Sequence, residues 1–163
     1  MNTNIEVKVE LVFVGKTSKN YFQDAIEEYT KRILRYTSFE VRVIPDVKNA
    51  KNLSESQLKD LEGNAILKQI ETSDFVVLLD DKGKSFTSKE MAFWLEQKQN
   101  QSIKKVIFVI GGAYGFSESV YARSNEKISL SKLTFSHQIV RPIFLEQLYR
   151  CFSIINGEPY HHE

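Results

Sequence analysis

Hydrophobic residues recur along this chain at two alternating spacings, one typical of strands and the other of helices. Strands are predicted at residues 7–14, 39–44, 75–79, 106–110 and 128–130, where β-branched and aromatic residues cluster or alternate. Helical spacing predicts helices at residues 20–36, 54–70, 87–95, 117–124 and 143–155. Because strands and helices alternate, we expect an α/β fold, in which helices flank a parallel sheet on both faces.

Short polar signals mark the ends of several elements. Ser54 with Gln57, and Thr87 with Glu90, have the spacing of a capping box, which predicts a helix start at each place. Residues 80–84 are mostly charged and include a glycine, so a turn is expected directly after the third strand.

The last predicted helix is unusually apolar. Its apolar residues are Ile143, Phe144, Leu145, Leu148, Tyr149, Cys151, Phe152, Ile154 and Ile155. A surface helix needs only one apolar stripe, so this helix is expected to bury one side in the core and another against a second subunit, in a homodimer. The alternative is a central helix in a monomer. Asn156-Gly157 predicts the helix end, and Pro142 either occupies the first helical position or kinks the helix.

Length and composition predict one domain over residues 1–163. No apolar run approaches the roughly 20 residues of a membrane span, and the first residues lack the blocks of a signal peptide. One cysteine, Cys151, allows no internal disulfide. We therefore expect a cytoplasmic protein. A net charge of +1 argues against an extended basic coat for nucleic acid, but is compatible with one local RNA contact.

A glycine turn follows the fourth predicted strand, in the sequence Gly-Gly-Ala-Tyr-Gly at residues 111–115. Gly111 and Gly112 carry no β-carbon, so a ligand can approach the backbone closely. Ligands of open α/β sheets collect at such strand ends. The G-x-G-x-x-G and P-loop patterns are absent from the sequence, which argues against dinucleotides and nucleoside triphosphates. Hydroxyl groups further on could surround a small polar ligand; they belong to Ser129, Ser131, Thr134 and Ser136.

The remaining reactive residue types have ordinary interpretations when taken alone. The histidines are His137, His161 and His162. They lack the spacing of metal ligands, so no metal is expected. Cys151 is expected to pack in the core or in an interface. Arg150 needs a partner on so apolar a helix, either Glu146 four residues earlier, a phosphate, or a carboxylate of a partner subunit.

Five segments, in order, resemble the RlmH family of ribosomal RNA large-subunit methyltransferases, which belong to the SPOUT class. They are residues 108–115 (FVIGGAYG), 129–135 (SLSKLTF), 137–138 (HQ), 146–150 (EQLYR) and 159–161 (PYH). The resemblance covers essentially the whole chain. This chain has Ser136 where the family often has proline, and His162 where the family often has lysine or arginine.

The resemblance implies an α/β fold with a trefoil knot in its carboxyl-terminal part, and a homodimer that binds S-adenosyl-L-methionine in the knot. It implies methylation of N3 of a pseudouridine in helix 69 of 23S rRNA, on the assembled ribosome. The family's cofactor positions fall on Leu79, Gly111, Leu130, Ser131, Lys132, Leu133, Thr134 and Phe135. Its functional tail residues fall on Arg150, Tyr160 and His161.

The implied chemistry suggests roles for the tail. The acceptor nitrogen is a weakly acidic imide that must lose its proton, and His161 is the candidate general base unless it positions the RNA instead. Tyr160 is expected to stack on the target base, and Arg150 to contact phosphate or stabilise negative charge. If the tail of one subunit reaches the pocket of the other, each site is composite. Two alternatives are a SPOUT methyltransferase acting on transfer RNA and a non-enzymatic, flavodoxin-type α/β ligand-binding module.

Overall fold

The computed structural model describes residues 7–162 and contains a five-stranded sheet whose neighbouring strands all pair in parallel. The strands are β1 (Lys8–Val14), β2 (Phe39–Ile44), β3 (Phe75–Ser85), β4 (Lys105–Ile110) and β5 (Glu126–Ser129). The predicted α/β fold with a parallel sheet is confirmed. The spatial order is β2-β1-β4-β3-β5. A flavodoxin-like sheet has the order 2-1-3-4-5, so the exchanged positions of β3 and β4 argue against that module.

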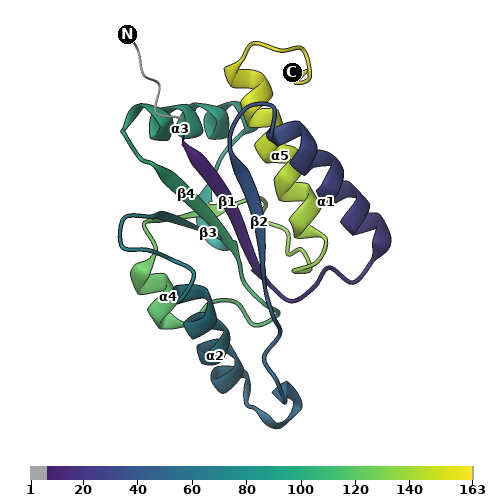
Figure 1. Ribbon diagram of the computed structural model, residues 1–163, viewed down its shortest axis with the longest axis vertical. Coiled ribbons are helices and arrows are strands. Elements are labelled where there is room, and N and C mark those ends of the chain that lie inside the picture. Colours follow the sequence, from purple (N-terminus) through teal and green to yellow (C-terminus); the bar gives the residue numbers. More distant parts are fainter. Residues whose placement is uncertain (1–6, 163) are drawn as a thin grey trace.

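Helices cover both faces of the sheet (Figure 1). They are α1 (Asn20–Ile33), α2 (Glu55–Leu67), α3 (Ser88–Asn100), α4 (Glu118–Arg123) and α5 (Val140–Ile155), with a short 3-10 turn, η1, at Ala50–Asn52. Helices α1, α3 and α5 pack on one face, and α2 and α4 pack on the other. None of the described helices is both long and apolar enough to cross a membrane.

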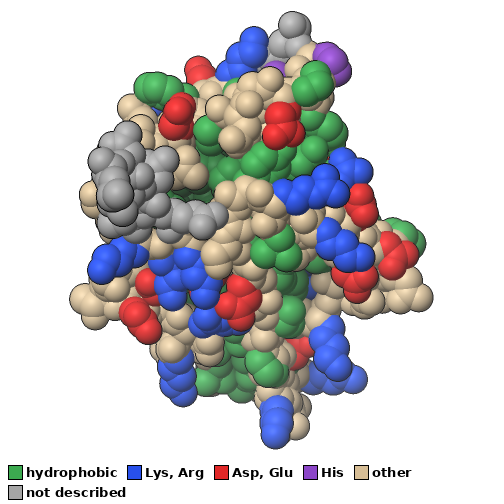
Figure 2. All heavy atoms as spheres, turned by 45° about the horizontal axis from the view of Figure 1, so that its top comes forward, with side chains coloured by type: hydrophobic (Ala, Val, Ile, Leu, Met, Phe, Trp, Pro, Cys, Tyr) green, Lys and Arg blue, Asp and Glu red, His purple; other side chains and the backbone are tan. Residues whose placement is uncertain are grey.

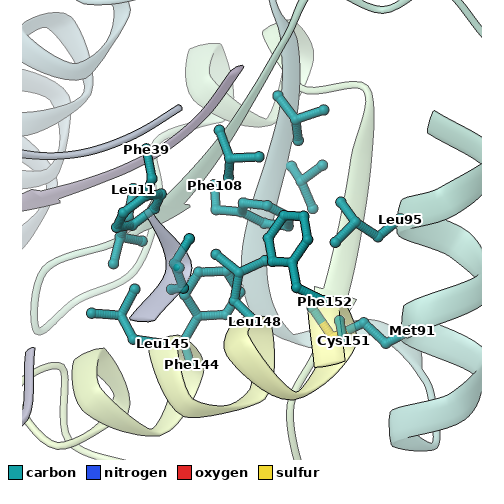
Figure 3. Packing of buried hydrophobic residues seen from close by; sticks show 14 of the residues in the cluster. Leu11, Phe39, Met91, Leu95, Phe108, Phe144, Leu145, Leu148, Cys151 and Phe152 are labelled. Atoms are coloured by element: carbon teal, nitrogen blue, oxygen red, sulfur yellow. The ribbon is translucent and has the colours of Figure 1, made fainter. Parts of the chain in front are cut away.

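The strands send alternate side chains into two apolar clusters, as expected for a sheet buried on both faces. Leu11 and Phe108 point toward α5, and Phe108 packs against Phe144 with ring centroids 4.8 Å apart (Figure 3). On the other face the strand residues meet α2 and α4; they are Val12, Val14, Ile44, Val76, Leu78, Ile107 and Val109. Cys151 is fully buried in the first cluster, as predicted, and burial raises the pKa of its thiol to about 12.

Both predicted capping boxes are present. The Ser54 hydroxyl accepts from the Gln57 N–H, and the Gln57 side chain accepts from the Ser54 N–H. Thr87 and Glu90 form the same reciprocal pair at the start of α3. These bonds satisfy donors that a helix start otherwise leaves without partners.

The prediction of a turn directly after residue 79 was wrong, because β3 continues to Ser85. The pairing with β5 shifts register between Leu79 and Lys84, and it resumes as Lys84 meets Ile128 and Ser85 meets Ser129. Gly83 permits this, since a β-carbon there would lie 2.6 Å from the Ile128 backbone nitrogen. The polar residues 80–83 therefore form an irregularity within a long strand.

Several helix limits also differ from the prediction. Helix α2 ends at Leu67, so Ile70 lies in the following turn, where its N–H donates to the Leu67 carbonyl. Helix α1 ends at Ile33, and residues 34–36 continue as a turn. Helix α5 begins at Val140, three residues early, so Pro142 lies in its first turn. An N–H group at this position would have no acceptor within the helix, so the proline costs no helical hydrogen bond.

Candidate functional site

A cavity of about 600 Å³ lies at the carboxyl ends of β3 and β4. This is where ligands of open α/β sheets usually bind, and the volume suits a small-molecule site. The wall combines three stretches of chain: residues 79–82 of β3, the turn at residues 110–116, and the loop that runs from β5 to α5. Tyr121 of α4 and Val140 of α5 complete it.

The structure brings together seven of the eight residues to which the family resemblance assigns the cofactor. Those that line the cavity are Leu79, Gly111, Leu130, Ser131, Leu133, Thr134 and Phe135. Lys132 is exposed and is not one of the lining residues, so the structure does not place its side chain at the cavity. Asp80, Asp81 and Lys82 also line the wall. The sequence reasoning missed them because it assigned them to a turn.

Gly111 contributes to the wall through its backbone, and its neighbours explain why it is glycine. A β-carbon there would lie 3.2 Å from the Phe116 ring and 3.3 Å from the Gly115 carbonyl group. The turn is tight because the Gly115 N–H donates to the Gly112 carbonyl at 3.1 Å, and Gly115 itself has a φ of +82°. Gly111 is thus required both for closure of the turn and for an open cavity wall.

The hydroxyl groups of the loop at residues 129–136 are used differently from what the sequence suggested. The Ser129 hydroxyl donates to the Ser131 carbonyl at 2.8 Å, and the Ser131 hydroxyl accepts from the Leu133 N–H at 2.9 Å. The Ser136 hydroxyl accepts from the Ile139 N–H at 3.1 Å. These three side chains shape the loop, in the manner of hydroxyl-supported turns. Polar contacts to a ligand would then come largely from the loop backbone.

A carboxylate of β3 that lines the cavity is held in its charged form. Asp80 accepts hydrogen bonds from the Tyr121 hydroxyl and, at 2.9 Å, from the Lys82 N–H. Burial favours the neutral acid, but these bonds outweigh it and lower the pKa of Asp80. Burial and the bond to Asp80 raise the pKa of Tyr121, which keeps the phenol protonated. The cavity therefore carries a stable negative charge, which suits a cationic ligand.

A buried arginine connects the loop before α5, which lines the cavity, to the end of β1. The Arg141 guanidinium donates to the Val14 carbonyl at 2.8 Å, the Gly15 carbonyl at 3.0 Å and the His137 carbonyl at 3.0 Å. It also donates to the Thr17 hydroxyl and lies 3.9 Å above the centroid of the Phe13 ring. Burial lowers the pKa of Arg141 to about 10, well above neutral pH. Its charge thus stays in the core, solvated by carbonyls and a ring.

Gln138 makes a second connection at the surface. Its side-chain oxygen accepts from the Ser18 N–H at 3.0 Å, and its amide nitrogen donates to the Lys16 carbonyl at 3.2 Å. The loop after β1 is therefore bonded to the segment that carries Ser136 and His137, both of which line the cavity.

The three tail residues singled out from the sequence come together at the end of α5. Glu146 pairs with Arg150, as the four-residue spacing predicted, and accepts from the Tyr160 hydroxyl at 3.0 Å. Arg150 lies 4.8 Å from the centroid of the Tyr160 ring. Its Nη1 lies 3.2 Å from Nδ1 of His161. Burial and hydrogen bonds to Tyr29 and Glu146 raise the pKa of Tyr160.

This tail cluster (Glu146, Arg150, Tyr160 and His161) is separate from the cavity within one chain. Arg150 lies ten residues along α5 from Val140, which corresponds to about 15 Å of axial rise. None of Arg150, Tyr160 and His161 is among the described residues that line the cavity. In Figure 1 the carboxyl terminus lies at the top of α5, far from α4, whose Tyr121 borders the cavity.

Comparison with known proteins agrees with this geometry. The family described as "Predicted SPOUT methyltransferase" matches residues 7–161. The chain belongs to the SPOUT methyltransferase family. Among curated relatives, the ribosomal RNA large subunit methyltransferase H of Parabacteroides distasonis is 55% identical over 96% of this chain and 100% of its own length. The protein of the same name from Christiangramia forsetii is 52% identical over 94% of this chain and 98% of its own.

Membership of the SPOUT family and the resemblance to the RlmH proteins, first inferred from five short segments, are thereby confirmed. The trefoil knot remains an implication of the family. The described residues contain no cluster of three or more histidine, cysteine or acidic side chains placed to hold a metal ion.

The residues of the cavity fit S-adenosylmethionine. Its volume of about 600 Å³ is in the range that encloses a nucleoside with an amino-acid arm. Leu79, Ile110 and Val140 offer apolar wall, and the loop at residues 130–135 offers backbone donors and acceptors for a purine edge. Asp80 supplies a negative charge for a ligand with positive sulfonium and ammonium groups.

Proposed function

We propose that this protein methylates N3 of a pseudouridine in helix 69 of 23S rRNA, on the assembled ribosome, with S-adenosylmethionine as methyl donor. The observation that carries the proposal is the cavity at the carboxyl ends of β3 and β4, which gathers Leu79, Gly111 and most of the loop at residues 130–135. The proposal is also supported by the match to the SPOUT family and by the relatives named ribosomal RNA large subunit methyltransferase H.

S-adenosylmethionine, when bound, supplies an activated methyl group on a positively charged sulfur. The protein's part is chiefly to hold donor and acceptor in line, which can account for a large share of a barrier. Leu79 and Gly111 line the cavity together with most of the loop at residues 130–135. Arg141 and Gln138 fix the far end of that loop, so the wall is organised before ligand arrives.

The tail cluster serves the RNA side of the reaction. Arg150 is the candidate contact to phosphate, and the Tyr160 ring is the candidate surface for stacking on a base. Arg150 lies about 15 Å along α5 from Val140 at the cavity of its own chain, and Tyr160 packs against Arg150. We therefore place both residues at the cavity of a second subunit. The active form is then a homodimer with two composite sites, and the outward side of α5, with its partly exposed Ile143 and Ile154, contributes to the interface.

The charge distribution favours recognition of a large assembled target. The net charge is +1, and positive and negative side chains alternate over much of the face in Figure 2. Tight binding of naked RNA requires many phosphate contacts, whereas a ribosome offers shape as well as charge. A ribosomal substrate would place the protein in the cytoplasm.

The test is methyl transfer from labelled S-adenosylmethionine to 70S ribosomes that lack this modification. We expect methylation at N3 of one pseudouridine, identified by mass spectrometry of the digested rRNA, and a much lower rate on free 23S rRNA. Equal rates on both substrates would contradict the ribosomal target. Methylation of transfer RNA in place of ribosomes would assign the protein to another SPOUT activity.

A further inference from the structure

Two carboxylates lie against the glycines that follow β1 and β4. A β-carbon at Gly112 would lie 2.4 Å from Oε2 and 2.9 Å from Oε1 of Glu62, and one at Gly15 would lie 2.6 Å from Oδ1 of Asp46. Strands β1 and β4 pair in parallel up to two residues before these glycines, so the two places are neighbours at the carboxyl edge of the sheet. Gly112 also lines the cavity, and the Glu62 carboxylate therefore lies at the edge of the cavity.

The Glu62 carboxylate is free to accept a proton. Within the described part of the chain it makes no hydrogen bond or ion pair, and neither of its oxygens is fully buried. Partial burial and the nearby charge of Asp46 raise the pKa of Glu62, which makes it a stronger base than an ordinary glutamate. Asp46 also acts on His137, which lines the cavity, and on Arg141. A carboxylate of this kind beside a cavity is a candidate general base.

We propose that Glu62 accepts the N3 proton of the target base at the cavity of its own chain. This inference rests on the proposed function. The proton passes from N3 to a Glu62 oxygen, and the electron pair left on N3 forms the bond to the methyl carbon. The pair of the broken C–S bond stays on sulfur, and Glu62 then releases its proton to water. His161 takes the other role considered for it, the positioning of the RNA.

Two variants separate a base from a carboxyl group that only supports the structure. Glu62→Gln keeps the size but cannot accept a proton near neutral pH, whereas Glu62→Asp keeps the carboxylate on a shorter arm. With 70S ribosomes, we expect kcat of wild type and of Glu62→Asp to be flat between about pH 6.5 and pH 8.5. In Glu62→Gln, kcat should be lower by about 100-fold or more at the acidic end and should rise about tenfold per pH unit, because only solvent then removes the proton. Asp60→Asn, exposed on the same helix, should match wild type.

Binding of S-adenosylmethionine shows whether the cavity is intact in these variants. Calorimetry should give each of them the wild-type affinity, because Glu62 is not one of the residues that line the cavity. A pH profile of Glu62→Gln parallel to that of wild type would overturn the proposal, and so would a loss of affinity as large as the loss of kcat. If wild-type protein fails to methylate ribosomes, the proposed function itself is wrong, and the role of Glu62 falls with it.

Discussion

Arg141 donates to the Gly15 carbonyl across 126 residues of sequence, and this bond joins the end of β1 to the segment that enters α5. The two neighbouring carbonyl acceptors, Val14 and His137, share the same guanidinium. Arg141→Leu would leave these buried carbonyls without a donor, so we expect it to lower the free energy of unfolding by about 3 kcal/mol. Urea titration measures this, with the exposed Arg35→Leu as matched control. A loss no larger than that of the control would contradict the role assigned to Arg141.

Gln138 offers a milder test of the same connection. Gln138→Ala removes the bonds to Ser18 and Lys16 at the surface without opening the core. We expect S-adenosylmethionine binding to weaken by about 1 kcal/mol, roughly fivefold, because the loop then pays an ordering cost on binding. Calorimetry should show no such change in Gln97→Ala, an exposed position on α3. An unchanged affinity in Gln138→Ala would show that the loop after β1 does not help to order the cavity.

The two glycines after β4 should differ in their response to a methyl group. In Gly111→Ala the new β-carbon meets the Phe116 ring and the Gly115 backbone, and a backbone cannot move cheaply. In Gly112→Ala it meets the Glu62 carboxylate, which is the end of a flexible side chain. We expect binding of S-adenosylmethionine to weaken by about 1.4 kcal/mol, or tenfold, in Gly111→Ala and by much less in Gly112→Ala. The reverse order would contradict the wall described for this turn.

His137 should make the cavity wall sensitive to acid. Burial and the nearby Arg141 charge lower the pKa of His137 from its usual value of 6.5, although Asp46 opposes them. The unfolded chain therefore takes up the proton first as pH falls, so the stability that neutral His137 contributes is present above pH 6.5 and is lost below it. We expect the melting temperature to fall less between pH 7.5 and 5.5 in His137→Gln than in wild type. An equal fall in melting temperature in both proteins would show that His137 does not contribute to the acid response.

The sequence was most informative where local spacing determines structure. The Ser54 and Thr87 capping boxes, and the Glu146–Arg150 pair, involve residues three or four positions apart. The cavity could also be predicted, because the carboxyl ends of parallel strands share one edge of a sheet. The continuation of β3 beyond its irregularity at residues 80–83 could not be predicted, because it depends on pairing with β5.

Long-range partners account for most of what the sequence did not reveal. The side-chain hydrogen bond to Asp80 comes from Tyr121, 41 residues away, so nothing in the local pattern marked Asp80 as part of the cavity. The serines of the loop were interpreted as ligand contacts, but Ser129 and Ser131 hold the loop itself. The contact between Arg150 and His161 depends on the return of the tail onto α5, which no periodicity encodes.

The central claim is that the cavity and the tail cluster, although apart in one chain, form one methyl-transfer site. Two variants that we expect to be inactive test it directly: Gly111→Val, which adds a branched side chain to the cavity wall, and His161→Ala, which removes the imidazole of the tail cluster. If sites are composite, random exchange of subunits gives dimers in which the intact cavity of one subunit meets the intact tail of the other. Mixing equal amounts should then restore about one quarter of the wild-type rate on 70S ribosomes. A mixture as inactive as its two components would show that the tail does not serve the cavity of a second subunit.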